Sequence, residues 1–318
     1  MIRIWPHRTY GVVILFLLVS FLHYYFWHVD NAVVVLSSSS IETTAKKQQP
    51  EFVATYTFPP PPEKLNTREN DVLIPHHLTP VNPSTLIPNG SYPIDVAHRR
   101  GYLHTGHCLF IMDASGLFLF LKRSSDVVTC PSTWSILGEH SIANEEARDT
   151  VVRGMEEELG LKQQQVVRRE ANDDYYYGEI DSSSSFTAEF QTIDKNIIHV
   201  AIQNITQYPL YYIRRYGPRL DNRIDSQVTY LWLARLPKRH EEIHIKLDEE
   251  VADHKWISLT EFSNWIEADA ARDNDDKEVK QHPLDGIRDD GPPNGDFCHH
   301  TIRSLYAKGL DHLKLMLL

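Results

Sequence analysis

The stretch Gly138–Leu161, GEHSIANEEARDTVVRGMEEELGL, predicts a helix that follows a loop glycine and ends at a second glycine. Within residues 144–159 an apolar side chain recurs at every fourth position, at Ala147, Val151, Met155 and Leu159. Such a stripe lies along one face of a helix and is expected to face a core. Asn144 or Glu145 would lie at the start, where an amide or carboxylate favours the positive helix end. Gly160 fits a left-handed C-cap.

The charged side of this helix has the spacing of a metal site. Arg153 and Glu157 are four residues apart, as are Gly154 and Glu158, so these positions share a face beside the apolar stripe. Magnesium is commonly held by one or two carboxylates together with substrate phosphate oxygens. Taken alone, the run Glu156–Glu158 would indicate only a solvated acidic helix face, so the wider pattern decides.

That pattern is six residues between Gly138 and Glu145, seven more before Arg153, and then Gly154. It resembles the box of the Nudix hydrolase family, which is a glycine, five residues, Glu, seven residues, Arg-Glu, an apolar residue, any residue, Glu-Glu, any residue, a glycine and an apolar residue. The first spacer is one residue longer here, and Gly154 stands where the family has a glutamate. In the family that glutamate binds metal and the arginine holds it in place. The resemblance therefore implies a site with one ligand fewer.

The resemblance implies a Nudix α/β/α sandwich with a mixed sheet between helices. It also implies hydrolysis of a nucleoside-diphosphate-linked or related diphosphate with Mg²⁺ or Mn²⁺. Glu157 and Glu158 would hold the metal, assisted by the Gly138 carbonyl. Arg153 and Glu145 would brace the loop and the helix. The base that activates water would come from elsewhere, and Glu249 or Glu250 is the candidate because both precede the Trp256 segment.

The flanking sequence extends the resemblance over residues 98–268. The apolar runs Cys108–Met112 and Leu117–Leu121, with a turn between them, predict a hairpin. Val228–Leu236 predicts a buried strand, and the stretch around Trp256 resembles the family's closing strand and helix start.

Within the family the spacing favours proteins similar to isopentenyl-diphosphate isomerase. His104 and His140 fall where that enzyme has metal-binding histidines, although each also suits a surface or capping role. Its two later glutamate ligands fall near Asp225 and Gln227. Its catalytic cysteine falls on Gly138, so isomerase activity is the less favoured alternative.

The N-terminus predicts a membrane anchor. Residues 10–27 are almost wholly apolar, interrupted only by Ser20 and His23, and at about 1.5 Å per residue they span roughly the hydrocarbon thickness. Arg3 and Arg8 precede them, which places the N-terminus in the cytosol. We expect a single-pass signal anchor with the C-terminal domain in the lumen of the secretory pathway. A cleaved signal peptide is the alternative.

The expected layout follows from these signals and from composition. It comprises a cytosolic tip and anchor at 1–36, a disordered Ser/Pro-rich stalk at 37–92, the Nudix domain at 93–268, an acidic flexible loop at 269–297 and a helix packed on the domain at 298–318.

The net charge of -11 argues against a nucleic-acid surface. An acidic domain that handles diphosphates would need cations, which agrees with a metal site. Arg214 and Arg215 belong to a local basic cluster that would either contact substrate phosphates or form an ordinary solvated loop.

The three cysteines are too few for a zinc site or a disulfide framework, although one pair could form. The sequons at Asn89 and Asn204 are compatible with a lumenal glycoprotein.

Two functions of different class fit the sequence. The first is a membrane-anchored Nudix-type hydrolase of a small-molecule diphosphate. The second is a catalytically weak or inactive Nudix module that binds a ligand or partner, and Gly154 is the feature that favours it.

Overall fold

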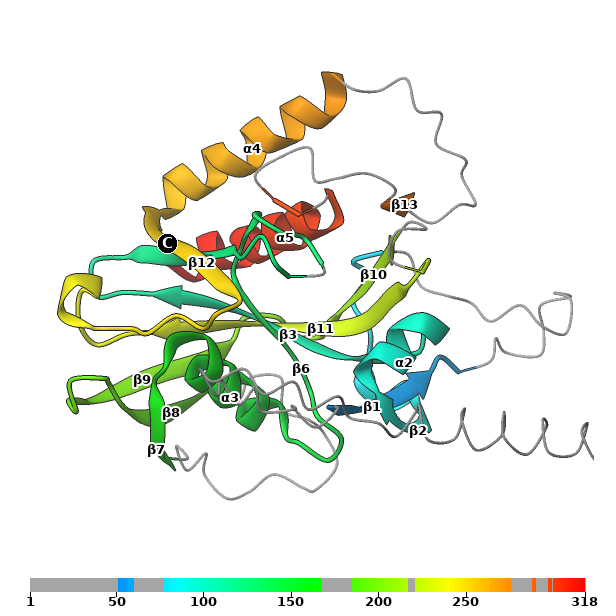
Figure 1. Ribbon diagram of the computed structural model, residues 1–318, viewed down its shortest axis with the longest axis horizontal. Coiled ribbons are helices and arrows are strands. Elements are labelled where there is room, and N and C mark those ends of the chain that lie inside the picture. The colour runs from blue at the N-terminus through cyan, green and yellow to red at the C-terminus, as the bar shows by residue number, and fades with distance from the viewer. Residues whose placement is uncertain are drawn as a thin grey trace, which may run out of the picture. The chain divides into compact units, whose positions relative to one another are not determined.

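The computed structural model describes residues 51–59, 77–127, 129–167, 185–216, 221–275, 288–289, 297–298 and 300–317. The chain divides into two compact units, residues 1–49 and residues 50–318. All of the described residues belong to the second unit (Figure 1).

The second unit is built on one large sheet. Its strands are β1 (Phe52–Thr57), β2 (Ile87–Pro93), β3 (Leu103–Met112), β4 (Leu117–Arg123), β5 (Trp134–Ser135), β6 (Leu137–His140), β7 (Lys162–Val167), β8 (Ser185–Gln191), β9 (Ile197–Asn204), β10 (Leu210–Tyr216), β11 (Ile224–Arg235), β12 (Val251–Ser258) and β13 (Arg288–Asp289). The helices are α2 (Ile94–Arg100), α3 (Ala147–Leu159), α4 (Leu259–Asp275) and α5 (His300–Leu317), with short 3-10 turns at Pro83–Thr85 and His240–Glu242.

The sheet is mixed. Its main path runs β12-β4-β3-β11-β9-β8-β7, with β1, β2, β5, β6, β10 and β13 attached beside it. Strands β3 and β11 are parallel over their length, from Ser226 opposite Leu103 to Arg235 opposite Met112. The other neighbours along the path are antiparallel. The expected hairpin is present as β3 and β4, and the expected buried strand is β11.

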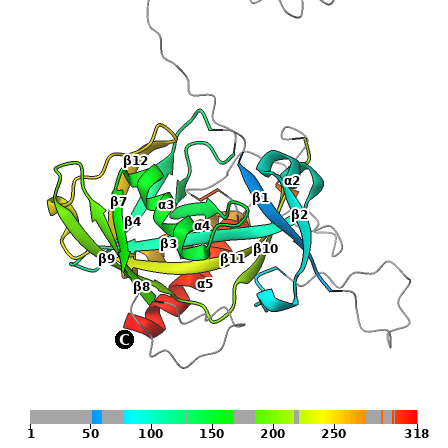
Figure 2. The same ribbon diagram turned by 90° about the horizontal axis from the view of Figure 1, so that it is seen from below.

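Two cores lie on the two faces of this sheet, because successive strand residues point to opposite sides. On β3, Leu109 and Ile111 belong to a core that includes the apolar stripe of α3. Phe110 belongs to the other core, with side chains of α4 and α5. Figure 1 shows α4 and α5 on one side of the sheet and α3 on the other, and Figure 2 shows α3 lying across β3 and β11. This is the expected α/β/α arrangement.

Helix α3 follows the predicted stripe closely. Val151, Met155 and Leu159 are at most 1% exposed, and Gly160 caps the C-terminus with φ 64°. The start differs from the expectation, because the helix begins at Ala147 and Glu146 takes the N-cap position without a side-chain hydrogen bond.

Parts of the expected stalk and loop belong to the folded unit. β1 and all of β2 except Pro93 fall in the range 37–92, and β1 pairs with β2 and with β3. Residues 269–275 continue α4 rather than beginning a flexible loop. Leu305, Leu310 and Leu313 of α5 lie in the core that also contains Phe262 and Ile266 of α4.

The expectation of a single-pass membrane protein is corrected by the helices. None of those in the described part of the chain is long and apolar enough to cross a membrane. The predicted anchor, residues 10–27, lies outside the described residues.

The cysteines and the Asn204 sequon are further sequence signals that the structure describes. Cys130 and Cys298 form a disulfide and Cys108 is free. The Asn204 sequon does not suit glycosylation in the folded protein. Its side chain is 7% exposed and accepts hydrogen bonds from the backbone and hydroxyl of Thr206.

Candidate functional site

Arg153 of α3 joins the two sides of the box. Its Nε donates to Glu145 Oε1 at 2.9 Å. Its Nη1 donates to Glu139 Oε2 at 3.0 Å and to Glu157 Oε2 at 3.1 Å. Its Nη2 donates to the carbonyl of His140 at 2.7 Å. One guanidinium thus fixes strand β6 and the following loop against the helix.

Glu139, Glu145 and Glu157 all contact the guanidinium of Arg153. Their pKa values shift in different directions. Burial raises the pKa of Glu139 to about 8, more than Arg153 lowers it. Burial also raises the pKa of Glu157. At Glu145 burial is outweighed by hydrogen bonds from Arg153, the Ile142 backbone and a threonine hydroxyl, so its pKa is lowered. Glu145 is therefore the firmly ionised partner of Arg153.

Glu158 points into different surroundings from its neighbour Glu157. Burial raises its pKa to about 7, opposed by the charge of Arg123 and reinforced by those of Asp248 and Glu250. Strongly shifted carboxyl groups beside a cavity are typical of functional sites. Glu158 therefore combines a raised pKa with the influence of charges that lie outside the box.

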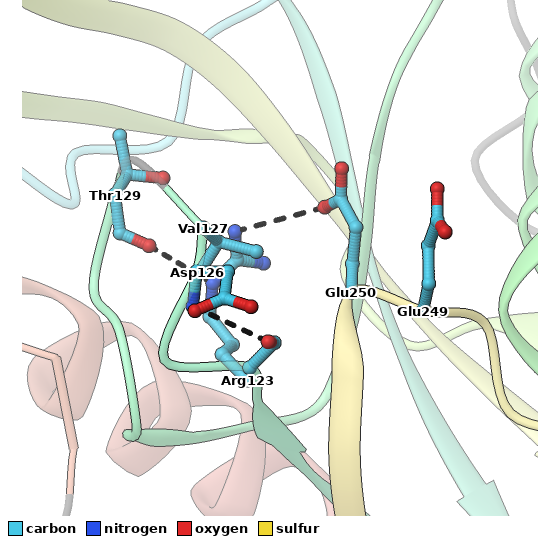
Figure 3. A pocket seen from close by; sticks show the side chains of 7 residues that line it. Arg123, Asp126, Val127, Thr129, Glu249 and Glu250 are labelled. Carbon is cyan, nitrogen blue, oxygen red and sulfur yellow. Dashed lines mark hydrogen bonds and ion pairs between the residues drawn. The ribbon is translucent and has the colours of Figure 1, made fainter. Parts of the chain in front are cut away.

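Two of the residues that act on Glu158, Arg123 and Glu250, line a pocket of about 500 Å³. Its wall consists of Arg123, Ser124, Asp126, Val127, Thr129, Glu249 and Glu250, and we call it the Arg123 pocket. Arg123 Nε donates to the Thr129 carbonyl at 3.0 Å, and its Nη2 lies 3.9 Å from Glu250 Oε2. Figure 3 shows Glu249 and Glu250 side by side at one edge of the pocket, with Arg123 across from them.

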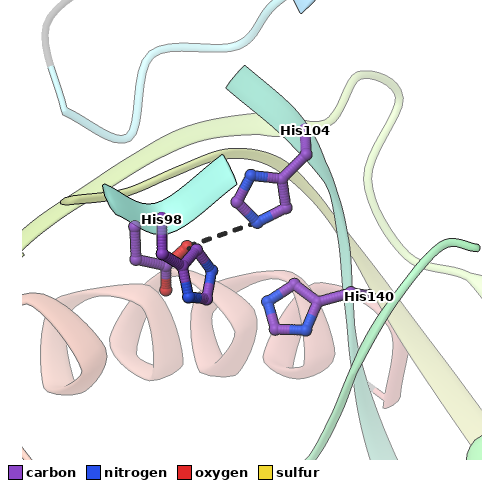
Figure 4. Close-up of side chains that lie close together, drawn as sticks. His98, His104 and His140 are labelled. Atoms are coloured by element: carbon purple, nitrogen blue, oxygen red, sulfur yellow. Dashed lines mark ion pairs between the residues drawn. The ribbon is translucent and has the colours of Figure 1, made fainter. Parts of the chain in front are cut away.

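A second group includes His140, whose backbone carbonyl the box arginine holds. His98 of α2, His104 of β3, His140 of β6 and Asp225 of β11 offer ligand atoms that all lie within 4.8 Å of one another. We call these four residues the histidine cluster. Figure 4 shows the three imidazoles turned toward one another from separate elements.

The hydrogen bonds of His104 define its protonation. The ring is fully buried, and burial lowers its pKa more than the nearby Asp225 raises it, so it is neutral. Nδ1 lies 3.0 Å from the Tyr102 carbonyl and must carry the proton. Nε2 then presents a lone pair to Asp225 Oδ1 at 3.5 Å, and Nε2 has no hydrogen-bond partner. Two facing acceptors are unfavourable unless a cation lies between them.

The rest of the cluster has the same character. His98 Nε2 lies 3.6 Å from the same Asp225 oxygen and is also buried without a hydrogen bond. Burial lowers the pKa of His140 to about 3, so its imidazole is neutral as well. Neutral imidazoles around an ionised carboxylate are the forms that bind metal.

Gln227 and Gly106 lie next to the histidine cluster, where Gln227 contacts Asp225. Gln227 Nε2 donates to Asp225 Oδ1 at 2.8 Å, which orients the carboxylate. Its amide lies so close to β3 that a Cβ at Gly106 would be 1.6 Å from Gln227 Oε1. Gly106 pairs directly with His140, and its missing side chain leaves room for the Gln227 amide.

The histidine cluster fits a divalent transition metal better than magnesium, since imidazole is a preferred ligand of Zn²⁺ and related ions. Glu157, Glu158 and the Gly138 carbonyl were the expected ligands. Glu157 forms an ion pair with Arg153 at 3.1 Å, and the expected ligand set stays a prediction.

A second group of possible ligands, Asp113, His240 and Glu241, has another explanation. Asp113 accepts hydrogen bonds from the backbones of Ser115, Leu117 and His240. It is therefore a turn-capping residue.

The two candidate substrate arginines lie on one strand but do not act together, because consecutive strand residues point to opposite faces. Arg214 is 6% exposed and its Nη1 lies 2.6 Å from Cys130 Sγ. Cys130 follows Thr129 of the Arg123 pocket. Arg214 thus supports the pocket loop from behind.

Position 138 does not offer isomerase chemistry. Gly138 pairs with Cys108 of β3, but burial raises the pKa of that thiol to about 12, with Asp225 adding to the effect. Such a thiol is protonated and unreactive at neutral pH.

His98, Glu139 and the residues of the Arg123 pocket other than Glu249 and Glu250 were not predicted as site residues. His98 precedes His104 by six positions, and this spacing of two histidines could have suggested a shared ligand role. Glu139 lies inside the quoted stretch, but its contact with Arg153 depends on how β6 packs against α3.

No family model matches the chain, and no curated protein matches its sequence. Three solved structures that resemble it are named as Nudix proteins or related hydrolases. The MutT protein from Methanosarcina mazei is 14% identical over 51% of this chain and 81% of that one, with a TM-score of 0.27. A NUDIX-family hydrolase from Clostridium perfringens is 13% identical over 66% and 97%, with a TM-score of 0.31. An ADP-ribose pyrophosphatase from Streptococcus suis is 14% identical over 49% and 74%, with a TM-score of 0.25.

Similarity at this level concerns the fold alone, and the chemistry is argued from the side chains described above.

Proposed function

We propose that the protein is a divalent-metal-dependent hydrolase of a diphosphate-containing small molecule. The observation that carries this proposal is Glu158 of the box helix, whose pKa is raised to about 7. The charges that act on it include those of Arg123 and Glu250, and both residues line the Arg123 pocket. Glu158 itself is not part of the pocket wall, and the charges of Arg123 and Glu250 link the box helix to the pocket.

In this proposal, separate residues would bind the metal, contact a phosphate and accept the proton of the attacking water. Glu157 and Glu158 would hold Mg²⁺ or Mn²⁺, which polarises the phosphates and assists the attack of water. Arg123 would place a positive charge against a phosphate oxygen. Glu249 or Glu250 would accept the proton of the attacking water, since both are carboxylates of the pocket wall.

The other residues support this machinery. Arg153 and Glu145 would hold the loop and α3 in register through their ion pair. Arg214 would steady the pocket loop through Cys130, and Arg215 remains a candidate phosphate contact. The histidine cluster would hold a transition metal, and its four protein ligands suit a closed structural centre.

Hydrolysis is tested with the full-length chain, a panel of nucleoside-diphosphate-linked and simple diphosphates, and Mg²⁺ or Mn²⁺. Glu158→Gln should lower kcat by about a hundredfold or more, the scale on which a catalytic carboxyl contributes. Glu156→Gln is the matched control, because Glu156 belongs to the same run of three but accepts a hydrogen bond from the Gln163 backbone instead. Absence of product on every substrate, or an equal loss in both variants, would contradict the proposal.

The histidine cluster is tested by metal content. The purified chain, loaded with Zn²⁺ or Co²⁺ and desalted, should retain about one equivalent, and His104→Ala should lose most of it because one of four ligands is gone. His199→Ala is the control, since His199 is exposed and pairs only with Glu189. Equal retention by the two variants would exclude the cluster as the site.

A second candidate function is a ligand-binding module with little or no turnover. It is favoured by Gly154, which leaves the box without one carboxylate. Tight binding of a diphosphate by calorimetry, with no release of product, would favour this alternative. The isomerase alternative requires conversion of isopentenyl diphosphate under the same conditions, and we expect none because position 138 has no thiol.

A further inference from the structure

A glycine and a glutamate have exchanged places in the box. Counted from Glu139 rather than Gly138, five residues precede Glu145 and seven more precede Arg153. This is the family spacing without an extra residue. Glu139 then stands at the family's glycine position, and Gly154 stands at the family's glutamate position.

The two positions also meet in space. A Cβ built on Gly154 would lie 2.5 Å from Cγ of Glu139 and 2.9 Å from Cδ2 of Leu137. A Cβ does not tolerate a contact of 2.5 Å, so the Glu139 side chain occupies the room that a side chain at 154 would need. The structure therefore accommodates a glutamate at one of the two positions, not at both.

The carboxylate of Glu139 contacts the box arginine. Glu139 Oε2 lies 3.0 Å from Arg153 Nη1, and the same nitrogen donates to Glu157. The Glu139 side chain is 13% exposed and that of Arg153 is 16% exposed. The pair is therefore shielded from water, where ion pairs depend strongly on geometry.

We propose that Glu139 is a positioning residue that replaces, from strand β6, the carboxylate that the box lacks at position 154 of α3. It holds the Arg153 guanidinium beside Glu157 and so fixes the carboxylate face of the helix. This inference rests on the proposed hydrolase function for its effect on turnover, but the exchange itself has a consequence for folding that needs no substrate.

Exchanging the residues at positions 139 and 154 tests the proposed role of Glu139. The variants are Glu139→Gly, Gly154→Glu, the double variant Glu139→Gly/Gly154→Glu, and a matched double variant Glu139→Gly/Gly154→Ala, each in the full-length chain. The two double variants free the same room and meet Leu137 in the same way. They differ in the side chain beyond Cβ, which in the glutamate variant brings a carboxylate back to Arg153.

Thermal unfolding and steady-state kinetics are measured for all of them. Gly154→Glu alone should unfold at a lower temperature than the parent, because its Cβ would overlap Glu139. Glu139→Gly should lose about tenfold or more in kcat. The glutamate double variant should recover most of that kcat and unfold at a higher temperature than the alanine double variant.

If the alanine double variant equals or exceeds the glutamate double variant in both unfolding temperature and kcat, Glu139 only fills space and the proposal is wrong. If the parent chain turns over no diphosphate, the hydrolase function fails, and the exchange is judged by unfolding temperature alone.

Discussion

Asp113 shows how one side chain organises a junction far from the box. It is 2% exposed and lies in the turn between β3 and β4. It accepts hydrogen bonds from the Ser115 and Leu117 backbones and from the backbone and ring of His240. His240 in turn stacks on Trp256 of β12. A single carboxylate thus joins the hairpin to the segment that leads into the last strand.

The pKa of Asp113 lies well below its usual range, because hydrogen bonds from His240, Leu117 and Ser115 outweigh its burial. A depressed pKa in the folded state contributes stability above the unfolded value of about 3.9, and that stability is lost as the pH falls through the folded value. Asp113→Asn should therefore lower the unfolding free energy at pH 7 by about 2 kcal/mol, the scale of hydrogen bonds to a charged group.

The difference between the parent and Asp113→Asn should shrink as the pH is lowered below about 4. Urea unfolding at pH 7 and at acid pH measures it. Asp95→Asn is the control, because Asp95 forms an exposed ion pair with Arg99 and should cost less than about 1 kcal/mol. A pH-independent difference would mean that the charge of Asp113 is not what matters.

For single residues, the sequence predicted features that depend on neighbours in the chain, and it missed contacts between residues that are far apart in the chain. The Val151, Met155 and Leu159 stripe and the Gly160 cap follow from local helix geometry, and both were predicted. The approach of Asp225 to His98 depends on how β11 and α2 dock, which no local pattern encodes. The same reasoning explains why Glu139 was missed, although it lies only one residue from the glycine that opened the stretch.

At the scale of elements, Arg153 is the link between helix α3, strand β6 and the loop between them. Its partners Glu145, Glu139 and the His140 carbonyl come from the loop and from β6. This link also connects the box to the histidine cluster, because the carbonyl it holds belongs to one of the cluster's imidazole residues.

Arg153→Met should lower the unfolding free energy at pH 7 by about 3 kcal/mol, because it leaves carboxylates largely buried without their cation. Chemical denaturation measures the change. Arg148→Met is the matched control on the same helix, since Arg148 pairs with the more exposed Glu146 and Asp149 and should cost less than about 1 kcal/mol. A comparable loss in both variants would show that the Arg153 network contributes no more than a surface pair.

The elements themselves were predicted unevenly. The strands around the box follow from runs of apolar residues, whereas β1 was assigned to the stalk because proline-rich sequence follows it. Its segment Phe52–Thr57 does alternate between outward and inward positions, with Val53 fully buried and Thr55 1% exposed. Six residues are a weak signal until β2 and β3 supply partners.

At the scale of the whole folded unit, the Cys130–Cys298 disulfide connects the pocket loop to the segment before α5. The two cysteines are 168 residues apart in the chain. In the chain-entropy description, closing a loop of this length stabilises the folded state by roughly 5 kcal/mol as an upper value. Phe297 beside it is 1% exposed, in the same core as Tyr306.

Reduction should therefore lower the unfolding temperature of the parent chain by several degrees or more, as expected for a loss of a few kcal/mol. The double variant Cys130→Ser/Cys298→Ser should start from the lower temperature and show no further change with reductant. Differential scanning calorimetry with and without dithiothreitol makes the comparison. An unchanged parent would mean that the bridge contributes little.

The same bridge makes a covalent ring of residues 130–298, and the ring contains the box, Asp225, and Glu249 and Glu250 of the Arg123 pocket. His98 and His104 lie on the chain before it. A protease that cuts one peptide bond inside the ring therefore leaves a single molecule whose parts separate only after reduction. On a gel without reductant such a nicked protein stays one covalent molecule, heavier by one water alone, so integrity measured that way says nothing about the continuity of the backbone inside the ring.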